Sequence, residues 1–255
     1  MRKYKGYLID LDGTMYRGSE KIEEAGNFIR ELIRLEIPFL FVTNNSTRTP
    51  EQVAGKLQSF DIPALPEQIF TSSIATANYI YELDKDARIF YIGEEGLQVA
   101  LNEKGFRFAK EDADIVVIGL DTKVTYEKLA IACIAIRNGA KFLSTNGDLA
   151  IPTERGLVPG NGAFTQLIQF STRVEPTIIG KPETIIMDQA LKVLGTKREE
   201  TVMVGDNYDT DILAGIRAGL DTLIVHTGVT TKEMIKHYEK QPTYSIDNLA
   251  EWPFL

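Results

Sequence analysis

Cysteine and histidine are scarce in this sequence, with one cysteine, Cys133, and two histidines, His226 and His237, among 255 residues. A single cysteine excludes an internal disulfide and is typical of a protein kept in a reducing compartment. Arg137 follows Cys133 by only four residues, which is not the spacing of a cysteine phosphatase loop, so we expect Cys133 to pack in the core. His226 ends an apolar run, where a packing role and a place beside a functional site are both open.

Basic residues and long apolar runs are also in short supply. Lys and Arg number 28 against 36 Asp and Glu, a net charge of -8, so we expect no nucleic-acid partner. The longest apolar run, Leu129 to Ile136, is far shorter than the roughly 20 residues that span a membrane. The first apolar stretch meets Asp10 too early for a signal peptide, so we expect a cytoplasmic protein with no membrane partner.

Short runs rich in β-branched and aromatic residues predict strands, and most are separated by segments with apolar residues at helical spacing. The predicted strands are Gly6 to Leu11, Pro38 to Val42, Arg88 to Ile92, Asp114 to Leu120, Lys141 to Ser144, Thr177 to Ile179, Thr201 to Val204 and Thr222 to His226. This alternation predicts an α/β fold whose parallel sheet is covered by helices on both faces. In such sheets the functional residues gather at the carboxyl ends of the strands.

Polar side chains follow the first two predicted strands. Asp10 and Asp12 lie at the end of the first strand, directly after its apolar run. Their spacing of two residues puts both side chains on the same face while the chain remains extended. Thr43, Asn44 and Asn45 follow the second strand. Each group alone also fits a structural role, because Asp-x-Asp-Gly is a common turn and hydroxyl and amide groups cap helices.

Charged side chains follow two later strands: Lys181 after one, and Asp206 with Asp211 after the other. Solvation of a lone lysine and helix capping by aspartates would explain each separately, but together the four strand ends predict one shared crevice. If Asp10, Asp12 and Asp206 meet there, each pair at ~4 Å repels by roughly 4 kcal/mol at an effective dielectric near 20, so a cation must join them. Oxygen ligands without cysteine or histidine favour Mg²⁺.

The sequence from Asp10 to Thr14, Asp-Leu-Asp-Gly-Thr, resembles the first motif of the haloacid dehalogenase superfamily. The stretches Val42 to Ser46, Gly180 to Pro182 and Gly205 to Asp211 resemble further motifs, and the likeness points to its NagD-like, para-nitrophenyl phosphatase branch. It covers essentially the whole chain. The resemblance implies a Rossmann-like parallel core with a smaller inserted α/β cap domain. The branch includes acid sugar, nucleotide and phosphoglycolate phosphatases, so the substrate stays open.

The resemblance also implies a role for each catalytic residue. Asp10 is expected to attack phosphorus and form an aspartyl phosphate. Asp12 is expected to protonate the leaving oxygen and then to deprotonate the water that cleaves the intermediate. Thr43 and Asn44 are expected to donate hydrogen bonds to the phosphoryl oxygens, and Lys181 to offset their negative charge.

The implied cofactor is Mg²⁺. Its expected ligands are the carboxylates of Asp10 and Asp206 and the backbone carbonyl of Asp12. Asp211 and Asn207 are expected to lie behind these ligands without binding the ion directly. From there Asp211 would orient Lys181 or metal-bound water.

The long interval between two of the motifs predicts the cap. Residues 44–180 separate Thr43 from Lys181, far more than one crossover needs. We predict a core at 1–85 and 179–255 and a cap at 86–178, with the helical pattern at 73–83 completing the core. Such a cap would close over a small phosphorylated metabolite and exclude water.

Candidate substrate-binding groups in the cap are Asn146 and Gly160, which join Asn44 and Asn45 near the second motif. Gly160-Asn161-Gly162 before a helical pattern could cradle an anion, although a turn and helix start explain it as well.

We therefore expect a Mg²⁺-dependent hydrolase of small phosphate monoesters such as sugar or acid-sugar phosphates, nucleotides and para-nitrophenyl phosphate. Two alternatives stay open. A phosphotransferase or mutase would pass the phosphoryl group to a sugar hydroxyl, and a signalling receiver module would retain it, although a receiver is about half this length. The sequence leaves the oligomeric state open, with a homodimer as one option.

Overall fold

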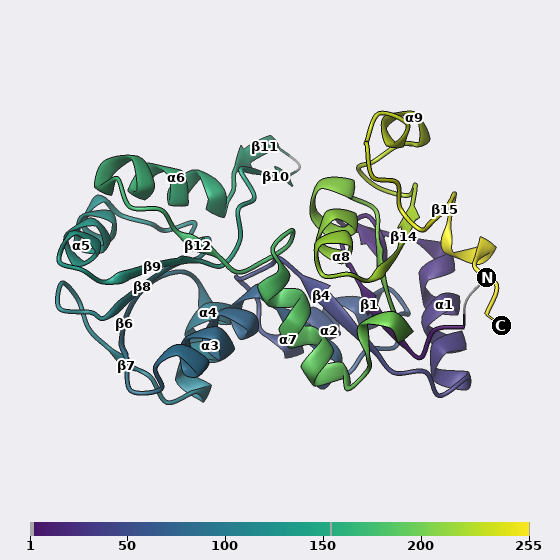
Figure 1. The fold of residues 1–255 in the computed structure, drawn as a ribbon, viewed down its shortest axis with the longest axis horizontal. Helices are drawn as coiled ribbons and strands as arrows, with labels where there is room; N and C mark the ends of the chain where they lie inside the picture. The colour runs from purple at the N-terminus through teal and green to yellow at the C-terminus, as the bar shows by residue number, and fades with distance from the viewer. Residues whose placement is uncertain (1–2, 154, 255) are drawn as a thin grey trace. The chain divides into compact units, whose positions relative to one another are not determined.

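The computed structural model describes residues 3–153 and 155–254, which form two compact units (Figure 1). The core unit comprises the chain up to residue 43, residues 50–70, and the chain from residue 181 onward; the inserted unit comprises 44–49 and 71–180. The inserted unit thus starts earlier than the 86–178 segment expected from the sequence. The reason is that helix α3 (Ser72–Leu83) packs on helix α4 (Glu95–Glu103) of this unit, through Ala77, Ile80 and Leu97.

The core unit is built on a six-stranded sheet with the order β15-β14-β13-β1-β4-β5. In sequence order its strands are β1 (Gly6–Ile9), β4 (Phe39–Thr43), β5 (Ile69–Thr71), β13 (Thr201–Gly205), β14 (Asp221–Val225) and β15 (Tyr244–Ile246). β1 pairs in parallel with both β13 and β4, and every residue of these three strands is buried. Burial on both faces explains why their sequences are apolar throughout rather than at alternate positions.

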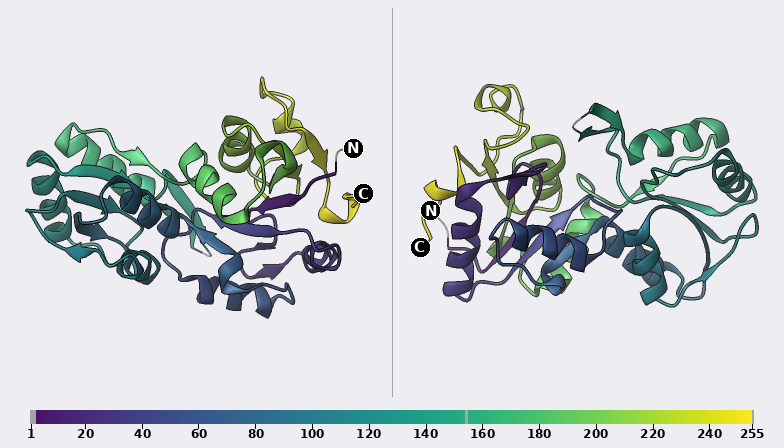
Figure 2. Two further views of the ribbon diagram at one scale, coloured as in Figure 1. Left: turned by 60° about the horizontal axis from the view of Figure 1, so that its bottom comes forward. Right: turned by 180° about the vertical axis from the view of Figure 1, so that it is seen from behind.

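Helices cover both faces of this sheet (Figure 2). On one face, α1 (Glu23–Arg34) and α2 (Pro50–Ser59) bury Phe28, Leu32 and Leu57 against Tyr7 and Ile9 of β1. α7 (Thr184–Leu194) and α8 (Leu213–Arg217) pack on the other face, where Gly215 lies against Met203 of β13. A π-helical turn, Tyr208–Ile212, precedes α8, and the short helix α9 (Lys232–Ile235) follows β14.

The inserted unit has a five-stranded sheet with the order β12-β9-β8-β6-β7. In sequence order the strands are β6 (Arg88–Ile92), β7 (Arg107–Phe108), β8 (Ile115–Ile118), β9 (Lys141–Ser144) and β12 (Thr177–Ile178), and their pairs are parallel. α3 and α4 cover one face, and α5 (Tyr126–Arg137) and α6 (Asn161–Thr172) cover the other. Cys133 of α5 is buried among the apolar residues between these two helices and the sheet, as expected.

Small hairpins complete the two units. β2 (Tyr16–Arg17) pairs with β3 (Glu20–Lys21) in the core unit, and β10 (Ala150–Thr153) pairs antiparallel with β11 (Gly156–Pro159) before α6 in the inserted unit. Within the residues that the structure describes, none of the helices combines the length and apolar character needed to cross a membrane.

Candidate active site

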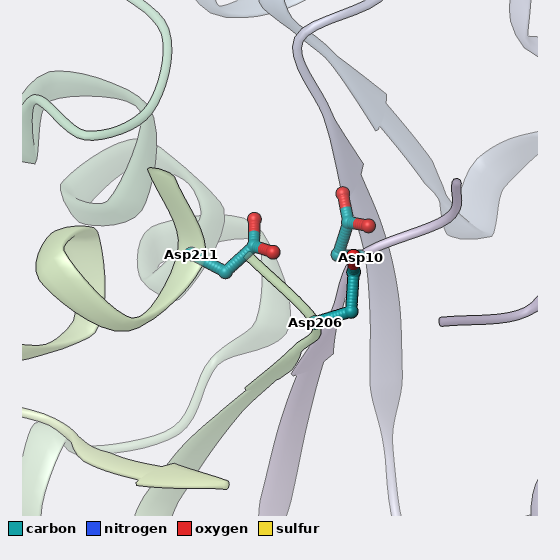
Figure 3. A group of neighbouring side chains, drawn as sticks. All are labelled: Asp10, Asp206 and Asp211. Carbon is teal, nitrogen blue, oxygen red and sulfur yellow. The ribbon is translucent and has the colours of Figure 1, made fainter. Parts of the chain in front are cut away.

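Three buried aspartates from separate segments of the core unit come together at the carboxyl ends of its central strands (Figure 3). Asp10 and Asp206 follow β1 and β13, which are adjacent parallel strands, so the two side chains emerge side by side. The π-helical turn after β13 brings Asp211 beside them. One carboxylate oxygen of each residue lies within 4.8 Å of the others. Asp211, which the sequence analysis expected to orient Lys181, is thus close enough to Asp10 and Asp206 to belong to the same cluster.

Lys181 is the cation of this cluster. Its Nζ donates hydrogen bonds to Asp10 Oδ1 at 2.6 Å, Asp211 Oδ1 at 2.7 Å and the Val42 carbonyl at 2.9 Å. Burial lowers the pKa of Lys181, but the carboxylates of Asp10 and Asp211 raise that pKa by more, so the ammonium stays charged. β12, the strand before Lys181, belongs to the inserted sheet, so Lys181 reaches the cluster from the loop before α7 and not from a core strand.

The single positive charge of Lys181 cannot balance three clustered carboxylates. Burial and the charge of Asp211 hold the pKa of Asp10 well above its usual range, although Lys181 opposes this. Burial, again with Asp211, raises the pKa of Asp206 to about 7. The donor set consists of hard carboxylate oxygens without sulfur or imidazole, which suits a cation such as Mg²⁺.

Backbone and hydroxyl groups fix the orientation of Asp206 and Asp211. Asp206 Oδ2 accepts the Val229 N–H at 2.7 Å, and Thr14 Oγ1 lies 3.3 Å from Asp206 Oδ1. Asp211 Oδ2 accepts the Asn207 N–H at 3.1 Å, so Asn207 contacts Asp211 through its backbone. Thr14 and Val229 were not among the predicted site residues; Thr14 lies inside the first motif, and Val229 acts only through its backbone.

Two glycines lie against the Asp206 carboxylate. A Cβ built on either Gly13 or Gly228 would overlap Asp206 Oδ2, and Gly13 also has a φ of +89°. Neither position can therefore carry a side chain without moving the carboxylate. Gly13 was predicted only as part of the first motif. Gly228 was not predicted, although it lies just beyond the end of β14.

Asp12 differs from the other three aspartates because its side chain is exposed. It follows Asp10 after β1 has ended, and its Oδ1 lies 3.4 Å from the Gly18 N–H. An exposed carboxylate two residues from a buried one can exchange protons with solvent while its neighbour is held in place. This exposure is compatible with the acid–base role that the sequence analysis expected of Asp12.

Thr43, Asn44 and Asn45 make different contacts in the structure. Thr43 ends β4 and is buried in the core unit, whereas Asn44 belongs to the inserted unit, where its Nδ2 donates to both carboxylate oxygens of Asp148 at 3.1 and 3.2 Å. Asn45 Oδ1 accepts the backbone N–H groups of Thr47 and Arg48. This is the turn-capping role that the sequence also allowed for Asn45.

The two predicted groups of the inserted unit, Asn146 and Gly160, build the loop around Asp148. Asn146 is buried, donating from Nδ2 to the Asn44 carbonyl at 2.8 Å and accepting the Asp148 N–H at 3.1 Å. A Cβ on Gly160 would overlap the Asp148 carbonyl. Gly160 is also the N-cap residue of α6, and the Asn161 side chain donates to the Ile118 carbonyl. These contacts favour a turn and helix start at Gly160-Asn161-Gly162 over an anion-binding loop.

The comparisons with known proteins agree over the whole chain. Residues 7–107 match a model described as haloacid dehalogenase-like hydrolase, and residues 178–252 match a second, HAD-hydrolase-like model. The chain belongs to the haloacid dehalogenase-like hydrolases. The predicted family, with its NagD and para-nitrophenyl phosphatase branch, and the predicted fold class are confirmed.

Relatives in this hydrolase family cover almost all of the chain. A 5′-nucleotidase of Bacillus subtilis, YutF, is 62% identical over 252 residues, which is 99% of this chain and 98% of YutF. An acid sugar phosphatase of Staphylococcus epidermidis is 54% identical over 250 residues, 98% of this chain and 96% of its own. The crystal structure of a double mutant of a thermostable NPPase from Geobacillus stearothermophilus superposes with a TM-score of 0.95 at 71% identity, covering 100% of both chains.

Proposed function

We propose that this chain hydrolyses small phosphate monoesters through an aspartyl phosphate formed on Asp10, with Mg²⁺ as cofactor. The observation that carries the proposal is the Asp10 carboxylate, held by the Lys181 ammonium at 2.6 Å beside oxygens of Asp206 and Asp211. The relatives named 5′-nucleotidase and acid sugar phosphatase support a small phosphorylated metabolite as substrate. The predicted enzyme class, a hydrolase of phosphoric monoester bonds, is confirmed at that level.

The proposed first step is in-line attack of an Asp10 oxygen on phosphorus, which forms the O–P bond as the bond to the leaving oxygen breaks. Asp12, protonated, gives its proton to that leaving oxygen. Lys181 donates a hydrogen bond to Asp10 and would offset negative charge on the transferring phosphoryl group. Thr43 would donate a hydrogen bond to a phosphoryl oxygen.

The second step is hydrolysis of the aspartyl phosphate. Asp12, now a carboxylate, takes a proton from the attacking water, and cleavage returns Asp10 to its starting form with release of phosphate. Mg²⁺, held by Asp10, Asp206 and the Asp12 carbonyl, would neutralise phosphoryl charge when bound. Asp211 keeps Lys181 in place, because it accepts from Nζ at 2.7 Å.

Asp12→Asn tests the proposed division of labour between the two half-reactions. Without a base for the second step, we expect phosphate release to slow by ~10²–10⁴-fold. Phosphorylated protein should accumulate, because a good leaving group such as para-nitrophenolate needs no proton to depart. The measurement is a rapid-quench assay with para-nitrophenyl phosphate and Mg²⁺, with intact-protein mass used to detect one added phosphoryl group.

The matched control is Asp209→Asn, which changes an exposed aspartate of the core unit outside the cluster and should keep the wild-type rate. Wild-type turnover in Asp12→Asn would refute the acid–base assignment. The same assay separates the alternatives for the wild-type protein. Stable phosphorylation without turnover would favour a receiver module, and a new phosphate ester formed from an added sugar would favour a phosphotransferase.

Mg²⁺ should stabilise the protein more at neutral than at acidic pH. Asp206 has a pKa of about 7 in the metal-free folded state against an ordinary value of 3.8, so between these values the folded state holds a proton that the unfolded chain releases. Metal-free stability therefore falls as pH rises through this window, while the ionised form that binds Mg²⁺ becomes available. We expect calorimetry to show a larger Mg²⁺-induced rise in Tm at about pH 8 than at about pH 5. Equal rises would contradict this link.

A further inference from the structure

The loop of residues 227–230, which follows β14, lies directly on the Asp206 carboxylate. The Val229 N–H donates to Asp206 Oδ2 at 2.7 Å, and the Thr230 N–H donates to the Asp206 carbonyl at 3.1 Å. Gly228 approaches so closely that a Cβ there would overlap the same carboxylate. The position of this loop therefore fixes one oxygen of Asp206 and, with it, the direction of the other.

The same loop is also fastened to the turn that carries Asp10 and Asp12. Thr227 Oγ1 donates to the Gly13 carbonyl at 2.6 Å, and Arg17 Nε donates to the Thr227 carbonyl. Loop 227–230 thus connects the two chain segments that supply the proposed metal ligands. A shift of this loop would move both segments relative to one another.

His226 holds the far end of this loop. Its Nδ1 lies 2.9 Å from the Thr230 carbonyl and its Nε2 lies 2.8 Å from Ser245 Oγ. A carbonyl oxygen can only accept, so Nδ1 carries the hydrogen and donates, while Nε2 of the neutral ring accepts from the Ser245 hydroxyl. The ring therefore links the last residue of the loop to β15, a neighbouring strand of the sheet.

We infer that His226 is a positioning residue that sets the affinity of the site for Mg²⁺ through loop 227–230. The inference rests on the proposed function, because it takes Asp206 as a metal ligand. The route runs from the imidazole to the Thr230 carbonyl, along the loop to the Val229 N–H, and from there to Asp206 Oδ2. Groups outside the ligands that orient them in this way usually contribute strongly to metal affinity.

The test measures Mg²⁺ binding directly, by titration calorimetry on the full chain, beside the metal-free Tm. We expect His226→Ala to weaken Mg²⁺ binding by about 10–100-fold. We expect His226→Asn to bind Mg²⁺ close to the wild-type level, because the Asn amide N–H can take the place of Nδ1–H. His237→Ala is the matched control, since it removes the other, exposed histidine and should leave Mg²⁺ binding unchanged.

A second variant guards against loss of folding. His226→Gln keeps a polar group within reach of Ser245 but places its amide too far out to reach the Thr230 carbonyl, so it should fold and still bind Mg²⁺ weakly. If His226→Ala and His226→Gln bind Mg²⁺ as the wild type does, the inference is wrong. It is also wrong if His226→Asn loses as much affinity as His226→Ala. If the wild-type protein itself binds no Mg²⁺, the proposed cofactor fails instead.

Discussion

Asp10→Asn should abolish phosphatase turnover, by ~10⁴-fold or more, the scale expected when a covalent nucleophile is removed. The amide matches the carboxylate in shape but cannot attack phosphorus. The fold should persist, because Lys181 keeps its contacts with Asp211 and the Val42 carbonyl. Metal-free stability should be equal or higher, since one of three mutually repelling carboxylates has gone. Steady-state hydrolysis of para-nitrophenyl phosphate and a thermal melt without Mg²⁺ check the two parts.

Asp12→Asn is the variant to compare with Asp10→Asn, because it makes the same chemical change two residues away. Asp10→Asn should show no phosphorylated protein by mass, whereas Asp12→Asn should accumulate it. A phosphoryl adduct on Asp10→Asn protein would mean that another side chain is the nucleophile.

Lys181→Met should destabilise the core unit by about 3–5 kcal/mol and remove activity, because it leaves Asp10 and Asp211 buried without their cation. The measurement is urea unfolding of the metal-free protein at about pH 7.5. The loss should shrink at about pH 5, because the pKa of Asp10 is held well above its usual range and its carboxylate can take up a proton instead.

Lys197→Met is the control, because this lysine is exposed in the same unit and its loss should change stability by less than about 0.5 kcal/mol. A cost below about 1 kcal/mol for Lys181→Met at neutral pH would show that the buried ion pairs do not hold the cluster together.

Much of the fold was predictable because the central strands are buried on both faces. β1, β4 and β13 have continuous apolar sequences that mark them without any knowledge of their partners. β15 and the hairpin of β10 and β11 were missed because they are short and half-exposed or exposed, so they lack the long apolar run of a buried strand. Short strands of this kind are defined by pairing, which the local sequence does not record.

The extent of the inserted unit could not be obtained from local patterns. The helix at Ser72–Leu83 has apolar residues on the face expected of any α/β helix, but nothing in them says which sheet that face will meet. Its packing on α4 is a long-range contact between segments that only the folded chain brings together.

The candidate site was predictable where strand order alone decides it. Asp10 and Asp206 follow buried parallel strands, and neighbouring strand ends meet at one edge of a sheet. Asp211 was also predicted at this site, but the π-helical turn that brings its carboxylate to Lys181 has no reliable sequence signature. The pairing of Asn44 with Asp148, 104 residues apart, was equally invisible before folding.

The charge deficit of the aspartate cluster ties folding to the ionic content of the surroundings. Three acidic groups and a single ammonium are buried together in the core unit, so a divalent ion would act as a structural component as well as a reagent. Removal of the divalent ion by a chelator would then destabilise the folded enzyme and abolish its activity together. We would then expect the divalent-ion content of purification and storage buffers to affect how much native protein survives.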